Sequence, residues 1–360
     1  MERSCEAVVA GQACLDLTPR FRDPAKPIQE IFRPGGGMRL TSMAFSGGGA
    51  VCNTGLALHR LGIRTLLWGR AGDDLFGREL VSILEKEGAA VRLKTCAGEA
   101  TPFTLVIVQP GEDRLFLHAP GADDGWTADD VDYGVLEDAR LFHFGYPTAM
   151  ARMYENGGAE LARLFERAKR TGVFTSLDMS MPHHGAEKED WTGILSRTLP
   201  NVDFFCPSVE EALALLDPAG SAAVRQEARR TGRPAAELIG ADAAEDLAAR
   251  FVGMGAGAAL IKRSTRGLYL HAGNVGLRGW EDTRRHQTAL QAGAAVSTTG
   301  AGDTAIAGFL GAVLHGCGPD EALRCAAMAG ALAVTGVTGH DRLPDSVEAL
   351  AVRAAQANPL

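Results

Sequence analysis

Short apolar runs alternate with longer helical patterns along almost the whole of the 360-residue chain. The apolar runs have the length of buried strands, and several of them are separated by segments with the periodicity of helices. The runs cover residues 7–11, 65–68, 104–108, 141–144, 173–177, 202–206 and 258–261, and the helical segments cover 50–61, 77–87, 149–169, 209–216 and 243–254. This alternation is typical of a mostly parallel sheet with helices on both faces. We therefore predict an α/β fold with three layers, α/β/α.

Three regions depart from this alternation. Residues 17–46 are rich in proline and glycine, and residues 98–120 alternate in polarity like a β-hairpin. We expect these two regions to form a small β appendage over one edge of the sheet. A third segment, residues 217–240, has the composition of a surface insertion. Single α/β domains often exceed the roughly 150 residues of an average domain, so we interpret residues 1–360 as one domain.

Charge and cysteine content limit the partners and the compartment. The chain carries 36 Lys and Arg against 44 Asp and Glu, and a net charge of −8 gives no general attraction to nucleic acid or to an anionic membrane. A bound phosphate would therefore need backbone amides and a few positioned cations. The 7 cysteines are scattered, odd in number and contain no CxxC pair, which is typical of a reducing compartment. Because we find neither a signal peptide nor an apolar run of about 18 residues, we expect a cytoplasmic protein.

The strongest local signal is a glycine-rich turn at residues 297–303 that leads directly into a helix. Residues 304–315 are apolar on all sides, so this helix is expected to be buried, with its N-terminus fixed in the core. The small residues Gly300, Ala301 and Gly302 allow N–H groups to converge on an anion. Asp303 adds a carboxylate beside that site, a combination that suits phosphoryl transfer with the carboxylate as the base. The alternative is that Asp303 only caps the helix.

A second glycine cluster, at residues 46–49, also opens a helical segment. Gly48 and Gly49 permit the close approach of a hydroxylated ligand, and Asn53 offers both a donor and an acceptor. The alternative is a flexible loop with an exposed asparagine. The GxGxxG spacing of dinucleotide-binding proteins is absent, which argues against a dinucleotide-dependent oxidoreductase.

Together the two clusters resemble the two signatures of the ribokinase-like, or PfkB, carbohydrate kinases. The first signature corresponds to Gly48-Gly49-x-x-x-Asn53, and the second to Thr-Thr-Gly-Ala-Gly-Asp at residues 298–303. Other segments that match lie at residues 11–16, 72–77 and 262–267, and the resemblance extends from about residue 8 to residue 339. It implies a ribokinase-like α/β/α fold in which the β appendage is the family's lid.

By similarity to this family, Asp303 is the catalytic base, and Gly300, Ala301 and Gly302 form the anion hole. The hydroxyl groups of the phosphoryl acceptor are expected to bind four residues, Asp16, Gly48, Gly49 and Asn53. Asp16 follows the first predicted strand, at the edge where a parallel sheet presents ligand-binding loops. Outside the family context, Asp16 would be interpreted as a turn residue.

The resemblance also implies a nucleotide site that binds ATP and Mg²⁺. Glu211 matches the glutamate of the family's Asn-x-x-Glu motif, which acts on magnesium through water, although alone it would be interpreted as a solvated helix residue. Four further residues lie where the family contacts the nucleotide, namely Ser208, Lys262, Ser264 and Gly267. The family's lid closes over the substrate and often forms a dimer contact, so a homodimer through the lid is one implication.

Four positions depart from the family pattern. Ser208 replaces the asparagine of Asn-x-x-Glu, and Ser264 replaces a glycine of the nucleotide loop. Ser297 stands where an aspartate helps to build a monovalent-cation site, which leaves dependence on K⁺ open. Residues 145–147, Gly-Tyr-Pro, replace the region that carries the sugar-binding carboxylate of ribokinase, which argues against ribose as the acceptor. None of these changes removes the base or the anion hole.

We therefore expect an ATP-dependent small-molecule kinase that transfers the γ-phosphoryl group to a hydroxyl of a sugar or sugar-like substrate. Two alternatives stay open, a nucleoside kinase of the same fold and a catalytically silent ligand-binding protein on this fold. The serines at 208, 264 and 297 motivate the second alternative, whereas the intact Thr-Gly-Ala-Gly-Asp motif opposes it. The acidic pairs at residues 123–124 and 129–130 are interpreted as turn and helix-start residues, and Cys14 and Cys52 as small buried hydrophobes.

Overall fold

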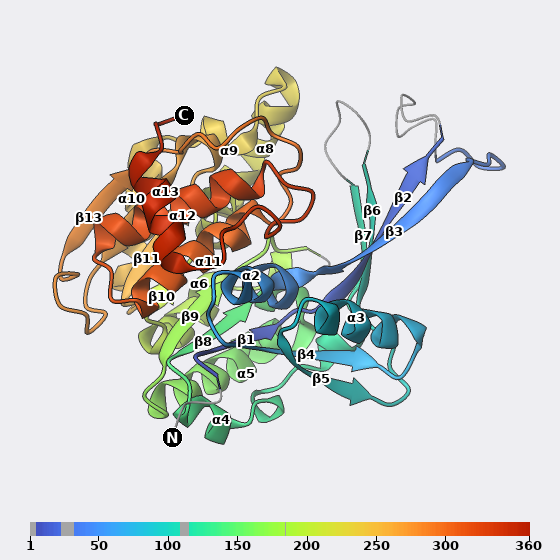
Figure 1. Cartoon of the computed structure of the whole chain (residues 1–360), viewed down its shortest axis with the longest axis horizontal. Helices are drawn as coiled ribbons and strands as arrows, with labels where there is room; N and C mark the ends of the chain where they lie inside the picture. Colours follow the sequence, from blue (N-terminus) through green and yellow to red (C-terminus); the bar gives the residue numbers. More distant parts are fainter. Residues whose placement is uncertain (1–4, 23–31, 109–114, 184) are drawn as a thin grey trace.

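A large sheet forms the centre of the protein (Figure 1). The computed structural model describes residues 5–22, 32–108, 115–183 and 185–360, and within them this sheet has nine strands in the order β13-β12-β11-β10-β9-β8-β1-β4-β5. The strands are β1 Ala7–Gly11, β4 Thr65–Gly72, β5 Ala90–Cys96, β8 Leu141–Gly145, β9 Phe174–Asp178, β10 Phe204–Phe205, β11 Ala258–Lys262, β12 Leu268–Ala272 and β13 Thr283–Gln287. Neighbouring strands from β11 to β5 are parallel, and β12 and β13 add an antiparallel edge. The mostly parallel sheet predicted from the sequence is confirmed.

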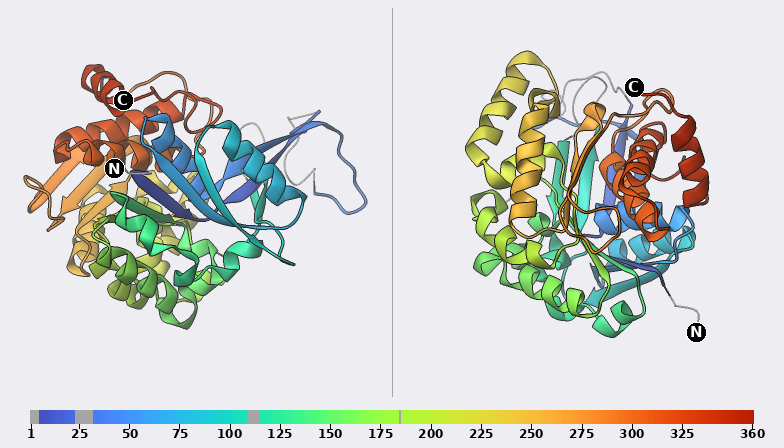
Figure 2. Two further views of the ribbon diagram at one scale, coloured as in Figure 1. Left: turned by 60° about the horizontal axis from the view of Figure 1, so that its bottom comes forward. Right: turned by 90° about the vertical axis from the view of Figure 1, so that its left-hand side faces the viewer.

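Helices cover both faces of this sheet and give the three layers that Figure 2 shows. One core, between the sheet and α5, α6, α7 and α10, contains Phe142, Phe165 and Phe251. A second core, between the other face and α2, α11, α12 and α13, contains Leu58 and Phe309. The helices are α2 Gly49–Arg60, α3 Leu75–Lys86, α4 Tyr133–Glu137, α5 Ala151–Arg170, α6 Trp191–Thr198, α7 Val209–Leu216, α8 Pro218–Thr231, α9 Ala235–Leu238, α10 Ala241–Gly253, α11 Ala301–Leu314, α12 Pro319–Ala333 and α13 Val347–Gln356. The predicted α/β/α architecture is confirmed.

Small residues bring β1, β8 and α2 together at one edge of the sheet. Gly11 ends β1, and a side chain there would collide with the backbone of Gly145, the last residue of β8. A side chain at Gly145 would in turn collide with Ala50 in the first turn of α2. The N–H of Gln12 also donates to the carbonyl oxygen of Gly145 at 3.2 Å. The first turn of α2 therefore lies at the carboxyl ends of β1 and β8, the edge at which parallel sheets bind ligands.

A separate four-stranded sheet extends away from the main body (Figure 1). Its order is β3-β2-β6-β7, and its strands are β2 Cys14–Phe21, β3 Leu40–Gly48, β6 Phe103–Ile107 and β7 Leu115–Ala119. We call this sheet the lid. The two regions predicted to form it, 17–46 and 98–120, supply most of its residues, and their segments 23–31 and 109–114 lie outside the described residues.

The register of the lid aligns polar side chains in one row. Ser46, Asp16, Thr104 and His118 are paired across β3, β2, β6 and β7. The expectation that Asp16 lies in a loop at the edge of the main sheet is wrong, because Asp16 is part of β2. Only Gln12 and Ala13 separate β1 from β2, so the chain passes from the main sheet into the lid without room for a loop.

Several elements differ from the sequence prediction. The strands β5, β12 and β13 and the helices α12 and α13 were not predicted, and β13 reads Thr-Arg-Arg-His-Gln, an exposed edge without an apolar run. The segment at 217–240, interpreted as a surface insertion, forms the largely exposed helices α8 and α9. Helix α11 begins at Ala301, before the predicted start at residue 304, so Asp303 lies in its first turn. Among the described residues, no helix combines the length and apolar character that a membrane span requires.

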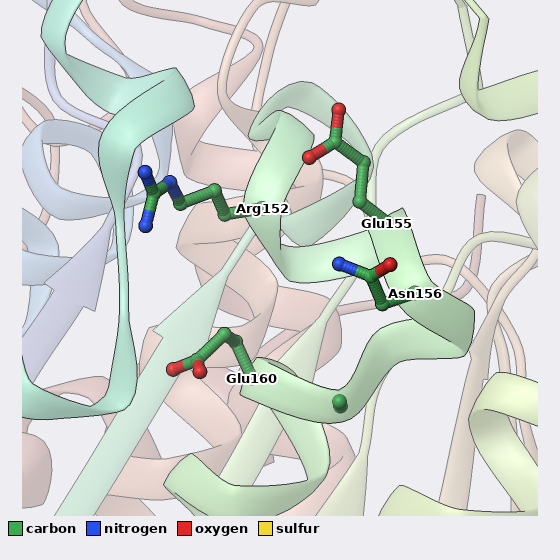
Figure 3. A pocket seen from close by; sticks show the side chains of 5 residues that line it. Arg152, Glu155, Asn156 and Glu160 are labelled. Atoms are coloured by element: carbon green, nitrogen blue, oxygen red, sulfur yellow. The ribbon is translucent and has the colours of Figure 1, made fainter.

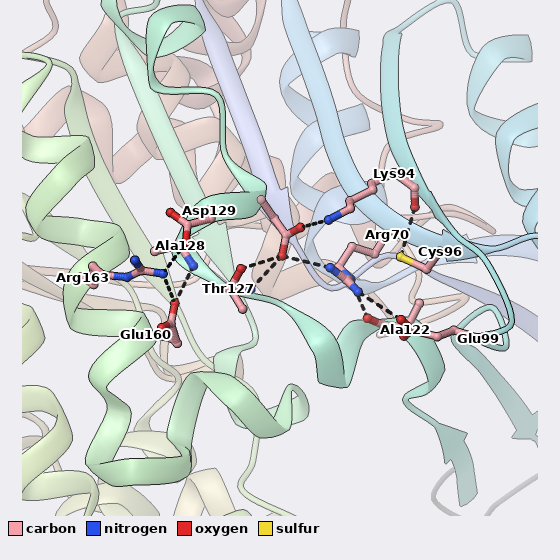
Figure 4. Close-up of polar contacts among 11 residues, drawn as sticks. Arg70, Lys94, Cys96, Glu99, Ala122, Thr127, Ala128, Asp129, Glu160 and Arg163 are labelled. Atoms are coloured by element: carbon pink, nitrogen blue, oxygen red, sulfur yellow. Dashed lines mark hydrogen bonds and ion pairs between the residues drawn. The ribbon is translucent and has the colours of Figure 1, made fainter.

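A buried arginine joins the main sheet to the segment that follows the lid (Figure 4). Arg70 of β4 is 6% exposed, and its guanidinium donates to the carbonyl oxygen of Ala122 at 2.7 Å and to Asp130 Oδ2 at 2.9 Å. Lys94 of β5 approaches the other oxygen of Asp130 at 2.5 Å. Asp130 also accepts from the N–H of Thr127 at 2.8 Å, so it lies at the start of a short helix, as predicted. Through Arg70 and Lys94 it is bonded to the strands β4 and β5 as well.

We expect Arg70→Ala to lower the free energy of unfolding by about 1–3 kcal/mol, because the buried Asp130 carboxylate loses its guanidinium partner and keeps only Lys94 as a cation. Chemical denaturation followed by circular dichroism measures this loss. Arg230→Ala is the matched control, since it removes an exposed ion pair with Glu227 on α8 and should leave the free energy of unfolding almost unchanged. Equal losses in the two variants would contradict the prediction.

Candidate active site

The residues of the predicted anion hole lie together at the N-terminus of α11. Gly300 caps the helix with a φ of 73°, a left-handed conformation that glycine adopts readily. The first bond along this helix runs from the N–H of Thr304 to the carbonyl oxygen of Gly300 at 2.8 Å. The N–H groups of Gly302 and Asp303 precede that bond and face the end of the helix where its dipole favours an anion.

Asp303 is buried in the first turn of α11, with 5% of its surface exposed. Its carboxylate accepts from Asn53 Nδ2 at 3.1 Å and from Thr54 Oγ1 at 3.4 Å, both on α2. The hydroxyl of Tyr146, which follows β8, donates to both carboxylate oxygens at 2.7 and 2.8 Å. Because these contacts come from α2 and from the segment after β8, the alternative that Asp303 only caps the helix is wrong. Asn53 lies on α2 and donates a hydrogen bond to Asp303, so the alternative of an exposed asparagine in a flexible loop is wrong.

Burial raises the pKa of Asp303 above its ordinary value. The ammonium of Lys262 and the hydrogen bonds from Tyr146, Asn53 and Thr54 act in the opposite direction and favour the charged carboxylate. A raised pKa brings a carboxylate closer to the operating range of a general base, since the ideal base titrates near the working pH.

Lys262 lies at the carboxyl end of β11, next to the anion hole. Its Nζ forms a buried ion pair with Asp178 Oδ1 at 2.8 Å, and Asp178 ends β9. A Cβ atom on Gly302 would lie 3.7 Å from Lys262 Nζ, so the ammonium is adjacent to the first turn of α11. Burial alone would lower the pKa of Lys262, but the carboxylates of Asp178 and Glu211 outweigh it and raise that pKa. The lysine is therefore a fixed positive charge beside the predicted anion hole.

Glu211 and Ser208 form the start of α7. The carboxylate of Glu211 accepts from the N–H of Ser208 at 2.6 Å, and the Ser208 hydroxyl accepts from the N–H of Glu211 at 3.2 Å. Glu211 is partly buried and faces Lys262, so the interpretation as a solvated helix residue is wrong. Ser208 also forms a parallel bridge with Lys262, which brings these three predicted residues together.

The other two predicted nucleotide residues lie just beyond β11. Ser264 has a φ of 51°, a left-handed conformation that glycine adopts more readily than serine. This conformation accounts for the glycine that the family has at this position. Gly267 has a φ of 84°, and a side chain there would collide with the carbonyl oxygen of Gln287. This loop therefore lies at the same edge of the sheet as Lys262, with exposed residues at 264–266.

The predicted acceptor residues gather where the lid meets α2. A Cβ atom on Gly48 would collide with the carboxylate of Asp16, so only glycine allows the two strands to place this side chain here. Gly49, the first residue of α2, packs in the same way against the backbone of Gln12. Burial raises the pKa of Asp16 to about 6. Asn53 then follows one turn further along α2, where it reaches Asp303.

A chain of polar contacts extends the acceptor region into the lid. Gln12 Nε2 lies 3.1 Å from His118 Nε2, and the other ring nitrogen of His118 lies 3.0 Å from the hydroxyl of Thr104. Thr104 in turn lies 3.5 Å from Cys14 Sγ, which donates to Asp16 at 3.5 Å. Cys14 and Cys52 are buried, as predicted. The region beside Asp16 is therefore rich in groups that can bind hydroxyls.

Sequence reasoning missed four of the residues at this site: Thr54, Tyr146, Asp178 and Gln12. Asp178 carried a usable signal, because it directly follows a predicted strand at the edge where parallel sheets bind ligands. Its Oδ2 is buried without a hydrogen-bond partner. Tyr146 lies in the segment 145–147 that the sequence analysis placed near the acceptor, but its contact with Asp303, 157 residues away, could not be predicted.

A hollow of about 360 Å³ lies elsewhere, at a break in α5 (Figure 3). The backbone leaves the helical conformation at residues 155–158, and the hollow is lined by Arg152, Glu155, Asn156, Ala159 and Glu160. None of the predicted site residues lines it. We therefore place no part of the candidate active site there.

Known proteins are similar in sequence to this chain. A sequence model of the pfkB family carbohydrate kinases matches residues 11–345. The chain belongs to the PfkB family. This PfkB protein is 29% identical to the Probable fructokinase-4 of Arabidopsis thaliana over 154 residues, which are 41% of this chain and 46% of that protein. It is 32% identical to Fructokinase-1 of Zea mays over 137 residues, which are 37% of this chain and 42% of that protein. The chain thus matches under half the length of these curated relatives.

Solved structures share the fold over nearly the whole chain. The Arabidopsis thaliana ribokinase complexed with ribose and ATP has a TM-score of 0.71 at 22% identity, and the match covers 97% of this chain and 99% of that one. The Burkholderia thailandensis nucleoside kinase in complex with inosine has a TM-score of 0.65 at 18% identity, with 98% and 97% covered. At these identities the likeness shows the fold, and the predicted ribokinase-like fold is confirmed.

We expect the KM for the phosphoryl acceptor to rise as the pH falls through about 6, the raised pKa of Asp16. The carboxylate accepts hydrogen bonds from hydroxyl groups best when it is charged, so this binding is present above that pKa and lost below it. Steady-state kinetics across this pH range measure the change. Asp16→Asn should bind the acceptor weakly at every pH and lose the dependence. A KM for the original protein that stays constant across the range would contradict the role of Asp16.

Proposed function

We propose that this PfkB protein is an ATP-dependent kinase that phosphorylates a hydroxyl group of a sugar or sugar-like compound. The observation that carries the proposal is the arrangement around the first turn of α11. The buried carboxylate of Asp303, the N–H groups of residues 301–303 and the ammonium of Lys262 lie together there. A base, an anion site and a cation are the parts that phosphoryl transfer to an alcohol requires.

In this proposal, the hydroxyl of the acceptor gives its proton to Asp303 as its oxygen attacks the γ-phosphorus of ATP. A new oxygen–phosphorus bond forms, the bond between the γ-phosphorus and the β–γ bridging oxygen breaks, and ADP leaves. Lys262 and the N–H groups of Gly302 and Asp303 stabilise the charge on the transferred group. Asp178 fixes the ammonium of Lys262 at 2.8 Å, so the cation is oriented before ATP binds.

The acceptor is assigned to the region between α2 and the lid. Asp16, Gly48, Gly49 and Asn53 hold its hydroxyls, and the neighbouring contacts of Gln12 with the lid add further polar groups. The curated relatives that match this chain are named fructokinases, which supports a sugar as the acceptor. The bulk of Tyr146 after β8 favours an acceptor other than ribose.

The nucleotide is assigned to the edge formed by β10 and β11. Ser208, Lys262, Ser264 and Gly267 lie at this edge, beside Glu211, and would contact ATP there. Within the described residues, no group of three or more histidine, cysteine, aspartate or glutamate side chains is arranged to hold a metal ion. Mg²⁺ commonly uses only one or two carboxylates together with waters and substrate phosphates. Glu211 and the unpartnered Oδ2 of Asp178 fit that role. When bound, Mg²⁺ neutralises charge on the phosphates.

One specific observation favours a second acceptor class. The chain shares its fold with the nucleoside kinase that was solved with inosine. A nucleoside presents a sugar hydroxyl to the same base, so the two classes differ only in what surrounds the sugar. A screen of ADP release over sugars, sugar acids, polyols and nucleosides separates them.

We also propose that residues 1–360 act as one kinase domain in the cytoplasm. The main sheet includes strands from residue 7 to residue 287, which supports one domain. The cysteines of the described chain form no disulfide, which fits a reducing compartment.

We expect Asp303→Asn to reduce the kcat for ADP release with the best acceptor by about 10²- to 10⁴-fold, the usual contribution of a general base. Binding of ATP, measured by calorimetry, should be unchanged, because the amide keeps the size and position of the side chain.

Asp320→Asn is the matched control, since Asp320 lies in the first turn of the neighbouring helix α12 and is exposed. It should retain full activity. Normal turnover in Asp303→Asn would overturn the assignment of the base. Binding of ATP by the original protein without transfer to any acceptor would favour a silent ligand-binding protein.

We propose that the lid also forms a homodimer through its apolar face. Phe45, Leu17, Leu105 and Leu117 are paired across the four strands and point away from the face that carries Asp16. Phe45 is 49% exposed and Leu117 is 45% exposed. Clustered apolar side chains that are exposed to this extent commonly mark an interaction surface.

We expect Phe45→Asp to shift the protein from dimer to monomer, because the new charge would be buried in the contact. Sedimentation velocity measures the mass. Val352→Asp introduces the same charge at an exposed position on α13 and should leave the dimer intact. A monomeric original protein, or a dimeric Phe45→Asp variant, would contradict this proposal.

A further inference from the structure

Three hydrogen-bond donors surround the carboxylate of Asp303. Asn53 donates to Oδ2 at 3.1 Å, and Thr54 donates to Oδ1 at 3.4 Å. The hydroxyl of Tyr146 lies across both oxygens, 2.7 Å from Oδ1 and 2.8 Å from Oδ2, and its one proton is shared between them. The oxygen of Tyr146 therefore occupies the position in front of the carboxylate that the hydroxyl of the proposed reaction needs.

A general base must lie within about 2.6–3.2 Å of the proton that it removes. One of the three donors therefore has to leave before an acceptor hydroxyl can bind. Asn53 and Thr54 belong to the first turns of α2, and Thr54 is fully buried. Tyr146 is only partly buried and belongs to the short segment between β8 and α5. Of the three donors, Tyr146 is the one that lies outside a helix and that contacts both carboxylate oxygens.

The backbone around Tyr146 holds its side chain on the base. Tyr146 has a φ of 66° and a ψ of 45°, a left-handed conformation that is unfavourable for a residue with a side chain. Its N–H donates to the carbonyl oxygen of Asp178 at 3.1 Å, and Pro147 follows it directly. Burial also raises the pKa of Tyr146, so the hydroxyl keeps its proton and acts as the donor.

We propose that the hydroxyl of Tyr146 occupies the place of the acceptor hydroxyl on Asp303 and is displaced when the acceptor binds. The proposal rests on the proposed function, because it takes Asp303 as the base. In the absence of an acceptor, Tyr146 keeps water away from the carboxylate. Tyr146 is thus a positioning residue that couples the use of ATP to the presence of the acceptor.

The reaction that Tyr146 suppresses is hydrolysis of ATP. A water molecule on Asp303 would lose a proton to the carboxylate as its oxygen bonds to the γ-phosphorus. The bond to the β–γ bridging oxygen would break, and the products would be ADP and inorganic phosphate. The chemistry differs from transfer only in the attacking oxygen, so the same base serves both reactions.

We expect Tyr146→Phe to raise acceptor-independent ATP hydrolysis by about tenfold or more, since it removes a hydrogen bond to a charged group and opens that position to water. Release of inorganic phosphate from ATP and Mg²⁺ alone measures this rate. Tyr133→Phe is the matched control, because it also removes one tyrosine hydroxyl bond, to the carbonyl oxygen of Ala128, and should leave hydrolysis unchanged. Thermal melting of both variants establishes that they fold.

The pH dependence of transfer tests whether Tyr146 leaves the base. Its hydrogen bond favours the charged carboxylate, so Tyr146→Phe should raise the pKa of Asp303 in the free enzyme and move the acid limb of kcat/KM to higher pH. The acid limb of kcat, which reports the complex with substrate, should not move. The other titratable groups that face Asp303 are retained in this variant: Lys262, Asp178, Glu211 and Cys52.

The outcomes separate this proposal from the proposed function. Unchanged hydrolysis in Tyr146→Phe, or a kcat limb that moves together with the kcat/KM limb, would show that Tyr146 stays on the base and would overturn the displacement. Transfer to sugars by the original protein would still support the kinase. Raised hydrolysis in Tyr146→Phe that disappears in the Tyr146→Phe, Asp303→Asn double variant would support the displacement, because the excess then depends on Asp303.

Discussion

The Asp303 carboxylate is buried, and the elements around it must replace the water that it has lost. A buried carboxylate is costly unless hydrogen bonds and an opposite charge replace its hydration. Here the replacements come from α2, from the segment after β8 and from β11, through Asn53, Thr54, Tyr146 and Lys262. Each of these elements is fixed in the main sheet or packed against it. The buried carboxylate therefore brings together α2, the segment after β8, β11 and its own helix α11, which are distant in sequence.

The charge balance of the site follows from the same burial. Lys262 lies among three carboxylates, Asp178, Glu211 and Asp303, so this part of the protein carries more negative than positive groups. On the proposed function, ATP adds further negative charge beside them. Backbone N–H groups at the start of α11 and a divalent cation from solution would then supply the attraction that the net charge of −8 does not provide.

The sequence was most informative where the local pattern alone determines the structure. Buried parallel strands such as β1 read as continuous apolar runs, and the glycine-rich turn before Asp303 indicated an anion site at a helix start. Edge strands such as β13 lack that apolar run, because one of their sides faces solvent. The position of Asp16 in a strand depended on a two-residue link that no periodicity reveals. The sequence placed Tyr146 near the acceptor but did not reveal its contact with Asp303, since that contact exists only after β8 and α11 are packed against the same helix.

The link between β1 and β2 connects the lid to the residues around Asp303. Gln12 donates its N–H to Gly145, the neighbour of Tyr146, and accepts from the N–H of Val51 in α2, one turn before Thr54. Its side chain meanwhile contacts His118 on the outermost strand of the lid. The backbone of Gln12 therefore contacts both the segment that carries Tyr146 and the helix that carries Asn53 and Thr54. On the proposed function, a change in the lid on binding of the acceptor would reach Tyr146 and α2 through this one residue.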